Sequence, residues 1–580
     1  MPSEHHHQGF GESSASGLSI AGASGEVLPR LHGAALRDLL RRLPEDELAT
    51  ALRHKLVRAV SLPGVVFHVA CGLPAVRQAR NLGLGVIGYG ETADFSAAVR
   101  AVHGHALLRE ATWGLAERTP RLSASRRMTA AQAVALALLA AGLALAGWLL
   151  PGRLFVALVS AFSGCFFLAV VALRVLCLLP AVQRPDDPPP AIADIDWPVY
   201  SVLVPLFRET AVLHQLMAAL RLLRYPEDRL DIKLILEAGD IAMQQAVAAL
   251  ELAHHFEVIV VPAGLPQTKP RALNFALQFC RGELLTIYDA EDIPEPEQLE
   301  KAAMRFAAAP PDLACLQAQL SFYNPAENWL TRQFSAEYAT LFGELLHTLD
   351  NHNLPLPLGG TSNHFRVKAL REAGAWDAWN VTEDADLGLR LARLGYGTGV
   401  LDSITYEEAN MRLGNWLHQR ARWLKGFLVT WLVHMREPLQ LMREVGPAGF
   451  WASQALTLGV FVSVLLHPLC MLATVILAIL YPALPPGTGL AYVLVSGVNL
   501  AVLVAGYGVS MMLTRRAMRR RGLSGWRGTL ATMPLYWMLM SCAGWMALWQ
   551  FLVRPFHWNK TEHGLSSPVR VRPGPARHTG

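Results

Sequence analysis

Residues 283–292 read ELLTIYDAED, a run of mostly apolar residues that ends in three carboxylates. Its composition is typical of a buried β-strand, and Asp289, Glu291 and Asp292 follow where that strand would end. Ligands of parallel sheets bind beyond the carboxyl ends of the strands. Carboxylates are hard oxygen ligands that suit a Mg²⁺ or Mn²⁺ ion, although acids alone are also ordinary loop residues. The stretch therefore predicts a sheet with a candidate metal site at its edge.

The same strand pattern recurs across residues 197–445. The runs YSVLVPLF, DIKLILEAGD and FEVIVVPA are rich in β-forming residues, and helical patterns such as VLHQLMAALRLL separate them. Strands that alternate with helices predict an α/β domain with a mainly parallel sheet and helices on both faces. Glu237 and Asp240 end a second strand, so we expect them at the same edge as Asp289.

The composition indicates a polytopic membrane protein with a sizeable soluble part. Hydrophobic residues make up 52% of the 580 residues, charged residues only 17%, and the mean hydropathy is +0.28. Apolar runs at 129–150 and 154–179 are long enough to span the hydrocarbon and predict a transmembrane hairpin, residues 129–179. Arg126 and Arg127 precede it, which places the N-terminus in the cytoplasm. The net charge of +5 is mild, and basic residues gather beside apolar segments, so we expect no nucleic-acid partner.

The C-terminal part, residues 449–553, returns to apolar sequence. We expect the runs 449–480 and 488–513 to cross the membrane out and back, because the arginine-rich segment TRRAMRRRGLSGWRG that follows marks a cytoplasmic loop. For 529–553, flanked by basic residues on both sides, we expect an interfacial or re-entrant hairpin. The stretch NWLHQRARWLKGFLVTWLVHM mixes cations with Trp and Leu and predicts a helix in the membrane surface.

The N-terminal region is separate from these features. Residues 1–26 are polar and rich in Gly and Ser, which predicts a disordered tail and no signal peptide. Residues 27–122 combine short strand patterns (VVFHVA, GVIGYG) with amphipathic helices and predict a small α/β module for regulation or docking. The seven cysteines are scattered, so we expect neither disulfides nor a zinc site.

Two further stretches bear chemically useful groups. VTEDADLGLRL, residues 381–391, sets Glu383 and Asp384 at the start of a helical pattern, where Thr382 or Asp384 could instead serve as a helix N-cap. TKPRALN supplies Lys269 and Arg271, cations able to meet phosphate oxygens, with a solvated turn as the alternative.

A third stretch, HQRARWLKG, places Gln419 and Arg422 on one helical face beside Trp423. These three side chains suit sugar transfer: the Arg422 guanidinium could bind a leaving diphosphate, the Gln419 amide could orient it, and the Trp423 indole could pack on a sugar ring. A membrane-surface helix without catalysis is the alternative. LGGTSNHFR, residues 358–366, contains Gly360 and Thr361 and would let backbone approach a sugar, or form a plain turn.

In combination, LILEAGD, DAED, TED and QRARW carry a family resemblance. The chain resembles membrane-embedded family 2 glycosyltransferases of the cellulose-synthase-like type, which have a GT-A domain. Within that family it is most similar to bacterial proteins of the phage-adsorption-protein-B and β-glucan synthase type. The likeness covers residues 197–430 and, through topology and the KTEHG motif, most of the chain beyond residue 129.

The resemblance implies an inverting hexosyltransferase that uses a nucleotide-sugar donor, most often a UDP-sugar. It implies that Asp384 is the catalytic base. It assigns the remaining roles as follows: Glu237, Asp240, Lys269, Asp289, Gln419 and Arg422 to the donor; Asp289 with Glu291 or Asp292 to the metal; Trp423, Glu383, Gly360 and Thr361 to the acceptor. Two departures leave assignments open, since EAGD has Gly239 where relatives carry an acid, and Glu291 replaces the usual second aspartate.

We therefore expect an enzyme of the bacterial inner membrane with a cytoplasmic catalytic domain that synthesises and secretes a polysaccharide. The alternatives are a single transfer to a lipid acceptor and a catalytically inert assembly or receptor component. The expected partners are the UDP-sugar, the growing glycan or lipid acceptor, membrane lipids, and an export partner in the periplasm or outer membrane. The resemblance also raises cyclic di-GMP regulation through the N-terminal module. In the cytoplasmic tail, residues 554–580, Thr561 and His563 could belong to a gating loop over the site.

Overall fold

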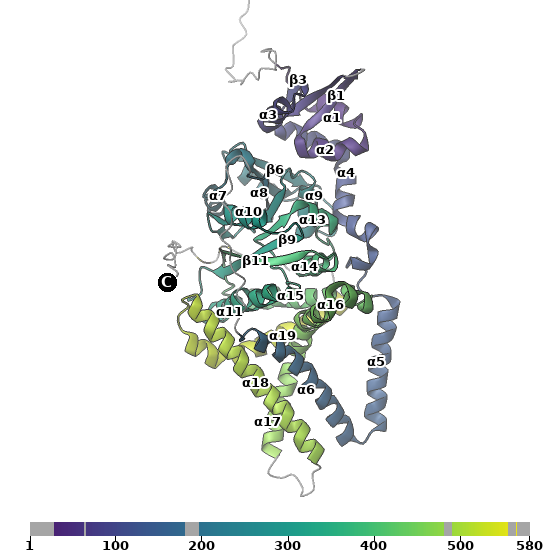
Figure 1. Cartoon of the computed structure of the whole chain (residues 1–580), viewed down its shortest axis with the longest axis vertical. Coiled ribbons are helices and arrows are strands. Elements are labelled where there is room, and N and C mark those ends of the chain that lie inside the picture. Colours follow the sequence, from purple (N-terminus) through teal and green to yellow (C-terminus); the bar gives the residue numbers. More distant parts are fainter. Residues whose placement is uncertain are drawn as a thin grey trace, which may run out of the picture. The chain divides into compact units, whose positions relative to one another are not determined.

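The structure is a computed structural model that describes residues 28–62, 65–179, 197–480 and 490–554, together with Gly564 and Ser566 (Figure 1). The chain divides into two compact units, Met1–Gly104 and His105–Gly580. The division falls inside helix α4 (Thr92–Arg118). In the second unit, the carbonyl oxygens of Ala111 and Thr112 on α4 accept hydrogen bonds from Asn274 (2.9 Å) and the Trp379 indole (3.1 Å).

The first unit is a small α/β module, as expected from the sequence. Its three-stranded sheet has the order β1-β2-β3, with β1 and β2 antiparallel and β2 and β3 parallel. The predicted strands VVFHVA and GVIGYG are β2 and β3. Its elements are α1 (Gly33–Arg41), α2 (Glu45–His54), β1 (Leu56–Leu62), β2 (Val65–Cys71), α3 (Leu73–Asn81) and β3 (Gly85–Gly90).

The second unit is built on an eight-stranded sheet with the order β6-β5-β4-β7-β10-β9-β11-β8. Strands β4 to β7 are mutually parallel, β9 and β11 are parallel, and β10 runs antiparallel between β7 and β9. The predicted, mainly parallel sheet is confirmed. The strands are β4 (Tyr200–Leu206), β5 (Leu230–Glu237), β6 (Phe256–Val261), β7 (Leu284–Ile287), β8 (Ile293–Pro294), β9 (Leu313–Phe322), β10 (Asn363–Arg366) and β11 (Gly397–Glu407).

Burial explains why these runs form the centre of the sheet. Every residue of β5 and of β7 is buried, as is typical of parallel strands covered by helices on both faces. The pairing makes β5, β7 and β11 parallel to one another, so their carboxyl ends lie along one edge of the sheet. The helices of this domain include α7 (Leu213–Arg221), α8 (Ile241–Ala248), α9 (Lys269–Leu277), α10 (Gln298–Ala308), α13 (Val367–Glu372) and α14 (Glu383–Arg393).

Long helices form the remainder of the second unit. Of the described residues, three stretches are long and apolar enough to cross a membrane: Ala130–Leu149, Pro438–Leu472 and Gly497–Arg520. A shorter apolar helix covers Ala161–Leu176. The elements are α5 (Ala130–Leu149), α6 (Gly152–Leu176), α11 (Trp329–Thr340), α15 (Leu413–His434), α16 (Pro438–Gln454), α17 (Val460–Leu480), α18 (Leu490–Arg520) and α19 (Trp526–Val553).

The expected re-entrant hairpin at 529–553 is wrong, because this segment lies within the single helix α19. Pro534 lies inside α19 without dividing it. A helix tolerates an internal proline when neighbouring helices or side chains satisfy the backbone groups that the proline leaves unpaired. Ala543 and Ala547 of α19 pack with Phe461 of α17 and with α15. A Cβ on Gly544 would meet a Val464 methyl at 2.6 Å, so only glycine allows α19 to lie this close to α17.

Candidate active site

The loop after β7 carries the predicted metal ligands. Asp292 is fully buried, and its Oδ2 accepts hydrogen bonds from the backbone N–H of Asp289 (2.7 Å) and from the Thr361 hydroxyl. These bonds close the turn that presents Asp289 and tie it to the segment before β10. The other oxygen of Asp292, Oδ1, is buried without a hydrogen-bond partner among the described residues. Asp292 therefore shapes the loop that presents Asp289.

A fourth carboxylate, Glu407 at the end of β11, joins this cluster. Burial, together with the charge of Asp289, raises the pKa of Glu291 to about 8. Burial, followed by the charges of Asp292, Glu291 and Asp289, holds the pKa of Glu407 well above its usual range. The sequence reasoning missed Glu407; two adjacent acids at a strand end, in TYEEAN, were the available signal. This crowding of carboxylates is what a bound cation would relieve.

The donor set fits a divalent ion that is shared with a ligand. Among the described residues, no three of these carboxylates bring one oxygen each within 4.8 Å of one another. Mg²⁺ is commonly held by only one or two carboxylates, with substrate phosphates completing its coordination. Asp289 and Glu291 line the central cavity and would hold the ion, whereas Asp292 does not line it.

Lys269 lies at the centre of the site, on the first residue of α9. Its ammonium donates to Asp289 Oδ1 and, at 2.7 Å, to the carbonyl oxygen of Gly360. Burial lowers the pKa of Lys269, but the charges of Asp289 and Glu383 outweigh burial and hold it above its usual range. Lys269 is therefore a fixed cation that connects the loop after β7 to the segment before β10.

Arg271 does not reach the site. Its guanidinium is fully buried and donates two hydrogen bonds to Glu237, at 2.9 and 2.7 Å. Burial raises the pKa of Glu237, and Arg271 opposes that effect. Glu237 lines the cavity but is paired with Arg271. Arg271 therefore binds a carboxylate of the protein, whereas the sequence predicted that it could bind phosphate.

Asp240 has a local structural task. It is the N-cap of α8, with Oδ1 accepting from Met243 N (3.2 Å) and Oδ2 accepting from Arg208 N (2.6 Å). Asp240 is not among the residues that line the cavity. Its assigned contact with a donor base stays a prediction.

Asp384 lies in the first turn of α14. Thr382 is the N-cap residue but makes no side-chain cap hydrogen bond, so the interpretation of Thr382 as a capping side chain is wrong. Asp384 Oδ1 instead accepts from the backbone N–H of Ala385 at 2.7 Å. Burial raises the pKa of Asp384 to about 6, while Ala385 N–H and the cations Lys269 and Arg422 oppose this. A carboxylate with a pKa in this range is suited to accept a proton near neutral pH.

Glu383 is the neighbour that shares this environment. Burial and the charge of Asp384 raise the pKa of Glu383 to about 7. Gly360 faces both Asp384 and Lys269: a Cβ at Gly360 would lie 3.2 Å from Asp384 Oδ2 and 3.8 Å from Lys269 Nζ. The predicted base, the fixed cation and the predicted acceptor loop therefore meet at one place.

Helix α15 forms a further side of the cavity, which is lined there by Gln419, Arg422 and Trp423. Burial lowers the pKa of Arg422, and the nearby charges of Glu383 and Asp384 oppose this. The Gln419 Oε1 accepts from Asn410 at 2.8 Å. The resemblance grouped these residues of α15 with Glu383 and Asp384 of α14. In the structure both sets line the same cavity.

Arg420, absent from the predicted set, braces this wall. It donates two hydrogen bonds of 2.8 Å to Glu337 of α11, and its guanidinium lies 4.6 Å from the ring centre of Trp423. Trp423 also stacks near Tyr338, with ring centres 6.2 Å apart and an interplanar angle of 23°. Cation–π and aromatic contacts hold the indole in position.

One cavity of about 2070 Å³ joins these walls and continues between the apolar helices. Its volume exceeds that of pockets for single small ligands, which typically measure about 300 to 1,000 Å³. Of the predicted site residues, those that line it are Glu237, Lys269, Asp289, Glu291, Gly360, Thr361, Glu383, Asp384, Gln419, Arg422 and Trp423.

Two described residues beyond α19, Gly564 and Ser566, contact an acid next to the site. The backbone N–H groups of Gly564 and Ser566 donate to the Glu408 carboxylate, at 2.5 and 2.6 Å. Glu408 is adjacent to Glu407, which lines the cavity. The predicted gating residues Thr561 and His563 lie outside the described residues, so their role stays a prediction.

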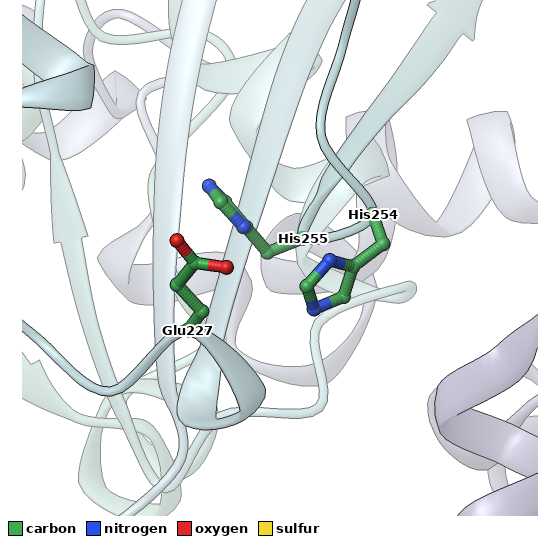
Figure 2. A group of neighbouring side chains, drawn as sticks. All are labelled: Glu227, His254 and His255. Carbon is green, nitrogen blue, oxygen red and sulfur yellow. The ribbon is translucent and has the colours of Figure 1, made fainter.

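Glu227, His254 and His255 form a second group of ligand-type side chains, whose ligand atoms all lie within 4.8 Å of one another (Figure 2). Glu227 begins the short helix before β5, and the two histidines directly precede β6. The group therefore lies at the amino ends of the parallel strands, opposite the edge that carries Asp289. It takes no part in the site.

A mainly parallel sheet thus carries acids and cations at its carboxyl edge and is joined to long apolar helices. The comparisons with known proteins indicate the class to which this arrangement is similar. Residues 284–557 match the family model described as Glycosyl transferase family group 2. The match covers just under half of the chain, which in this segment is similar to family 2 glycosyltransferases.

Several relatives are similar to part of the chain. A probable glycosyltransferase, YdaM, of Bacillus subtilis is 25% identical over 250 residues, 43% of this chain and 59% of that protein. The beta-monoglucosyldiacylglycerol synthase of Synechocystis is 26% identical over 276 residues, 46% of this chain and 56% of that protein. Cellulose synthase 2 of Novacetimonas hansenii is 29% identical over 248 residues, 42% of this chain and 15% of that protein. The chain thus spans less than two thirds of each of these relatives.

Among solved structures, the mannosyltransferase PcManGT of Pyrobaculum calidifontis, in complex with GDP-Man and Mn²⁺, aligns with a TM-score of 0.43. The sequences are 15% identical, and the alignment covers 69% of this chain and 98% of that chain.

Proposed function

We propose that this protein transfers a sugar from a nucleoside diphosphate sugar to a hydroxyl group, with inversion at the anomeric carbon. Asp384 removes the acceptor proton as the acceptor oxygen bonds to the anomeric carbon. The bond from that carbon to the diphosphate breaks, and the nucleoside diphosphate leaves with the bonding electrons. The family 2 match and the convergence of Asp384, Lys269 and Gly360 support this proposal.

The chain's own charges suit each part of this reaction. Lys269 and Arg422 supply positive charge in the cavity where a leaving diphosphate would develop negative charge. Asp384 supplies one base, and no second carboxylate is needed for a single inverting displacement. A positioned base typically contributes about 10² to 10⁴ in rate.

A divalent cation, Mg²⁺ or Mn²⁺, belongs to this proposal. Asp289 and Glu291 would hold it, and Glu407 would add to the negative field that attracts it. When bound, such an ion neutralises part of the diphosphate charge. Lys269 contacts Asp289 and would supply further positive charge for the diphosphate.

The donor is proposed to be a UDP-sugar, and the location to be the bacterial inner membrane with the GT-A domain in the cytoplasm. A polysaccharide product remains the prediction of the resemblance. Transfer to a lipid is the second candidate, and one observation favours it: the cavity extends from Asp384 to Phe162, Leu469 and Leu500 between apolar helices. That the domain is catalytically inert is the third candidate.

The test uses the full-length protein in lipid nanodiscs with Mg²⁺ or Mn²⁺ and a panel of labelled UDP-sugars, with GDP-sugars as a second donor class. We expect donor-dependent release of nucleoside diphosphate, reduced about 10²-fold or more by Asp384→Asn. Asp312→Asn, at an exposed position remote from the cavity, is the matched control. If the wild type turns over no donor, or the Asp384 variant equals it, the proposal is overturned.

A further inference from the structure

The membrane-side part of the cavity has walls made mainly of hydrocarbon. Between α6, α17 and α18 it is lined by side chains such as Phe162, Phe166, Val170, Phe461, Leu469 and Leu500. A hydroxyl-rich chain would lose hydrogen bonds to water here and regain few of them. A hydrocarbon chain loses nothing and gains contacts.

The same part of the cavity is lined by side chains that are themselves largely exposed. Among them are Leu139 (59%), Phe162 (78%) and Leu469 (53%). No residue of α5, which contributes Leu139, is buried. In a bilayer these surfaces face lipid, so a lipid chain can enter the cavity from the membrane.

One cation, Arg174, lies among these apolar side chains. Arg174, two residues before the end of α6, lines the cavity; it donates to the Ser510 hydroxyl, and its guanidinium carbon lies 5.6 Å from the Trp537 ring centre. Neither partner carries a negative charge. Among the described residues, no carboxylate lies within the 4.0 Å of an ion pair with Arg174.

Neighbouring arginines are neutralised. Arg420 is paired with Glu337 at 2.8 Å, and Arg516 is paired with Glu344 at 2.6 Å. A cation held among apolar side chains without a counter-ion is costly, and such groups in membrane helices commonly mark a ligand path. An arginine that only reaches for the membrane surface would point away from the helix bundle, whereas Arg174 points to Trp537 and Ser510 within it.

The depth of Arg174 identifies the kind of anion. Arg174 lies two residues before the carboxyl end of the apolar stretch Ala161–Leu176, and where this stretch lies in a bilayer, its end is at the level of the headgroups. A phosphate at that level can carry a hydrocarbon chain into the apolar cavity on one side. On the other side, a polar head can extend along the same cavity toward Asp384.

We propose that the acceptor is a membrane lipid with a phosphate between its hydrocarbon chain and its hydroxyl-bearing head. The phosphate binds Arg174, the hydrocarbon occupies the space between α6, α17 and α18, and the head hydroxyl meets Asp384. This inference rests on the proposed function. In the transfer, the head oxygen bonds to the sugar, its proton moves to Asp384, and the nucleoside diphosphate leaves with the electron pair.

The experiment compares wild type, Arg174→Gln and Arg174→Lys, each full-length in nanodiscs. Phosphatidylglycerol is the probe, because its phosphate lies between diacylglycerol and a hydroxyl-bearing head; diacylglycerol and soluble glycerol 3-phosphate each lack one part. Lipid retained by the detergent-exchanged protein is counted by mass spectrometry, and transfer and acceptor-free donor hydrolysis are measured in parallel. The control is Arg515→Gln, since Arg515 is exposed and does not line the cavity.

We expect wild type and the Arg515 variant to retain phosphatidylglycerol over diacylglycerol, and Arg174→Gln to lose this preference by about tenfold or more. Arg174→Lys is intermediate, and donor hydrolysis without acceptor is unchanged in the Arg515 variant. Glycerol 3-phosphate does not compete, because it has no hydrocarbon chain.

Equal lipid retention by wild type and Arg174→Gln overturns the inference. A high-molecular-mass glycan made equally well by both, without attached lipid, overturns it in favour of a growing polysaccharide in the cavity. If no donor is turned over but lipid retention still depends on Arg174, the proposed function fails while the lipid site stands.

Discussion

Gly360→Ala offers a sharp test of the site because the new methyl group points at two groups of the proposed mechanism. The added Cβ would lie 3.2 Å from Asp384 Oδ2 and 3.8 Å from Lys269 Nζ. An ordinary carbon–oxygen contact is nearer 3.5 Å or more, so Asp384 or the backbone must shift by a few tenths of an ångström. A misplacement of about 1 Å can reduce a rate about 10²-fold, which predicts a loss of about tenfold in kcat here.

Stability should not follow activity. Gly360 is not in the left-handed region, so alanine is allowed there and removes freedom from the unfolded chain, an effect worth about 0.4 to 1 kcal/mol in favour of folding. The assay is steady-state release of nucleoside diphosphate by the nanodisc protein, with thermal unfolding measured on the same samples.

Gly239→Ala is the matched control, since a Cβ at Gly239 meets nothing within 4 Å. It should leave kcat within about twofold of the wild-type value. Unchanged kcat in the Gly360 variant, or equal losses in both variants, would refute the placement of Asp384 beside the acceptor loop.

Because the base must be deprotonated, kcat/KM should rise with pH through the value of about 6 to which burial raises the pKa of Asp384, and the pH–rate profile of Asp384→Asn should lack this acidic limb. Arg271→Gln leaves the buried Glu237 carboxylate unpaired and should lower the free energy of unfolding by about 3 to 5 kcal/mol, as measured by denaturant titration, whereas Arg229→Gln at the surface should cost under about 0.5 kcal/mol. Glu408→Gln weakens the charge-assisted bonds to the backbone of Gly564 and Ser566 and should raise the donor KM several-fold, while an unchanged KM would separate these two residues from the site. Chelation of divalent ions should abolish nucleoside diphosphate release, and Mn²⁺ or Mg²⁺ should restore it; activity that survives chelation would exclude the proposed ion.

Local pattern was enough to predict the strands and the edge that carries the chemistry. ELLTIYDAED could be interpreted as β7 plus its acidic loop because strand preference and burial are properties of the run itself. The same is true of Ala130–Leu149, where length and hydropathy alone indicate a membrane span. The family resemblance added that Asp384 belongs with Arg422, two residues far apart in sequence that both line the cavity.

Other assignments depended on partners that no local pattern reveals. In TKPRALN, Arg271 was predicted to bind phosphate. In the structure its guanidinium donates instead to Glu237, at the end of β5. Glu407 joins the acidic cluster only because the crossover through β9 and β10 places β11 parallel to β7. For 529–553, packing against α15 and α17 favours one continuous helix over the hairpin suggested by its flanking charges.

The amino-acid sequence by itself determined which segments become strands, helices and membrane spans, because hydrophobic period, length and charge act within each segment. Only the tertiary structure decided which ionisable groups pair, which line the cavity, and that Arg174 forms no ion pair with a carboxylate among the described residues. The physical reason is that electrostatic energies depend on distance and on the surrounding dielectric. Both are set by contacts between segments that are remote in the chain.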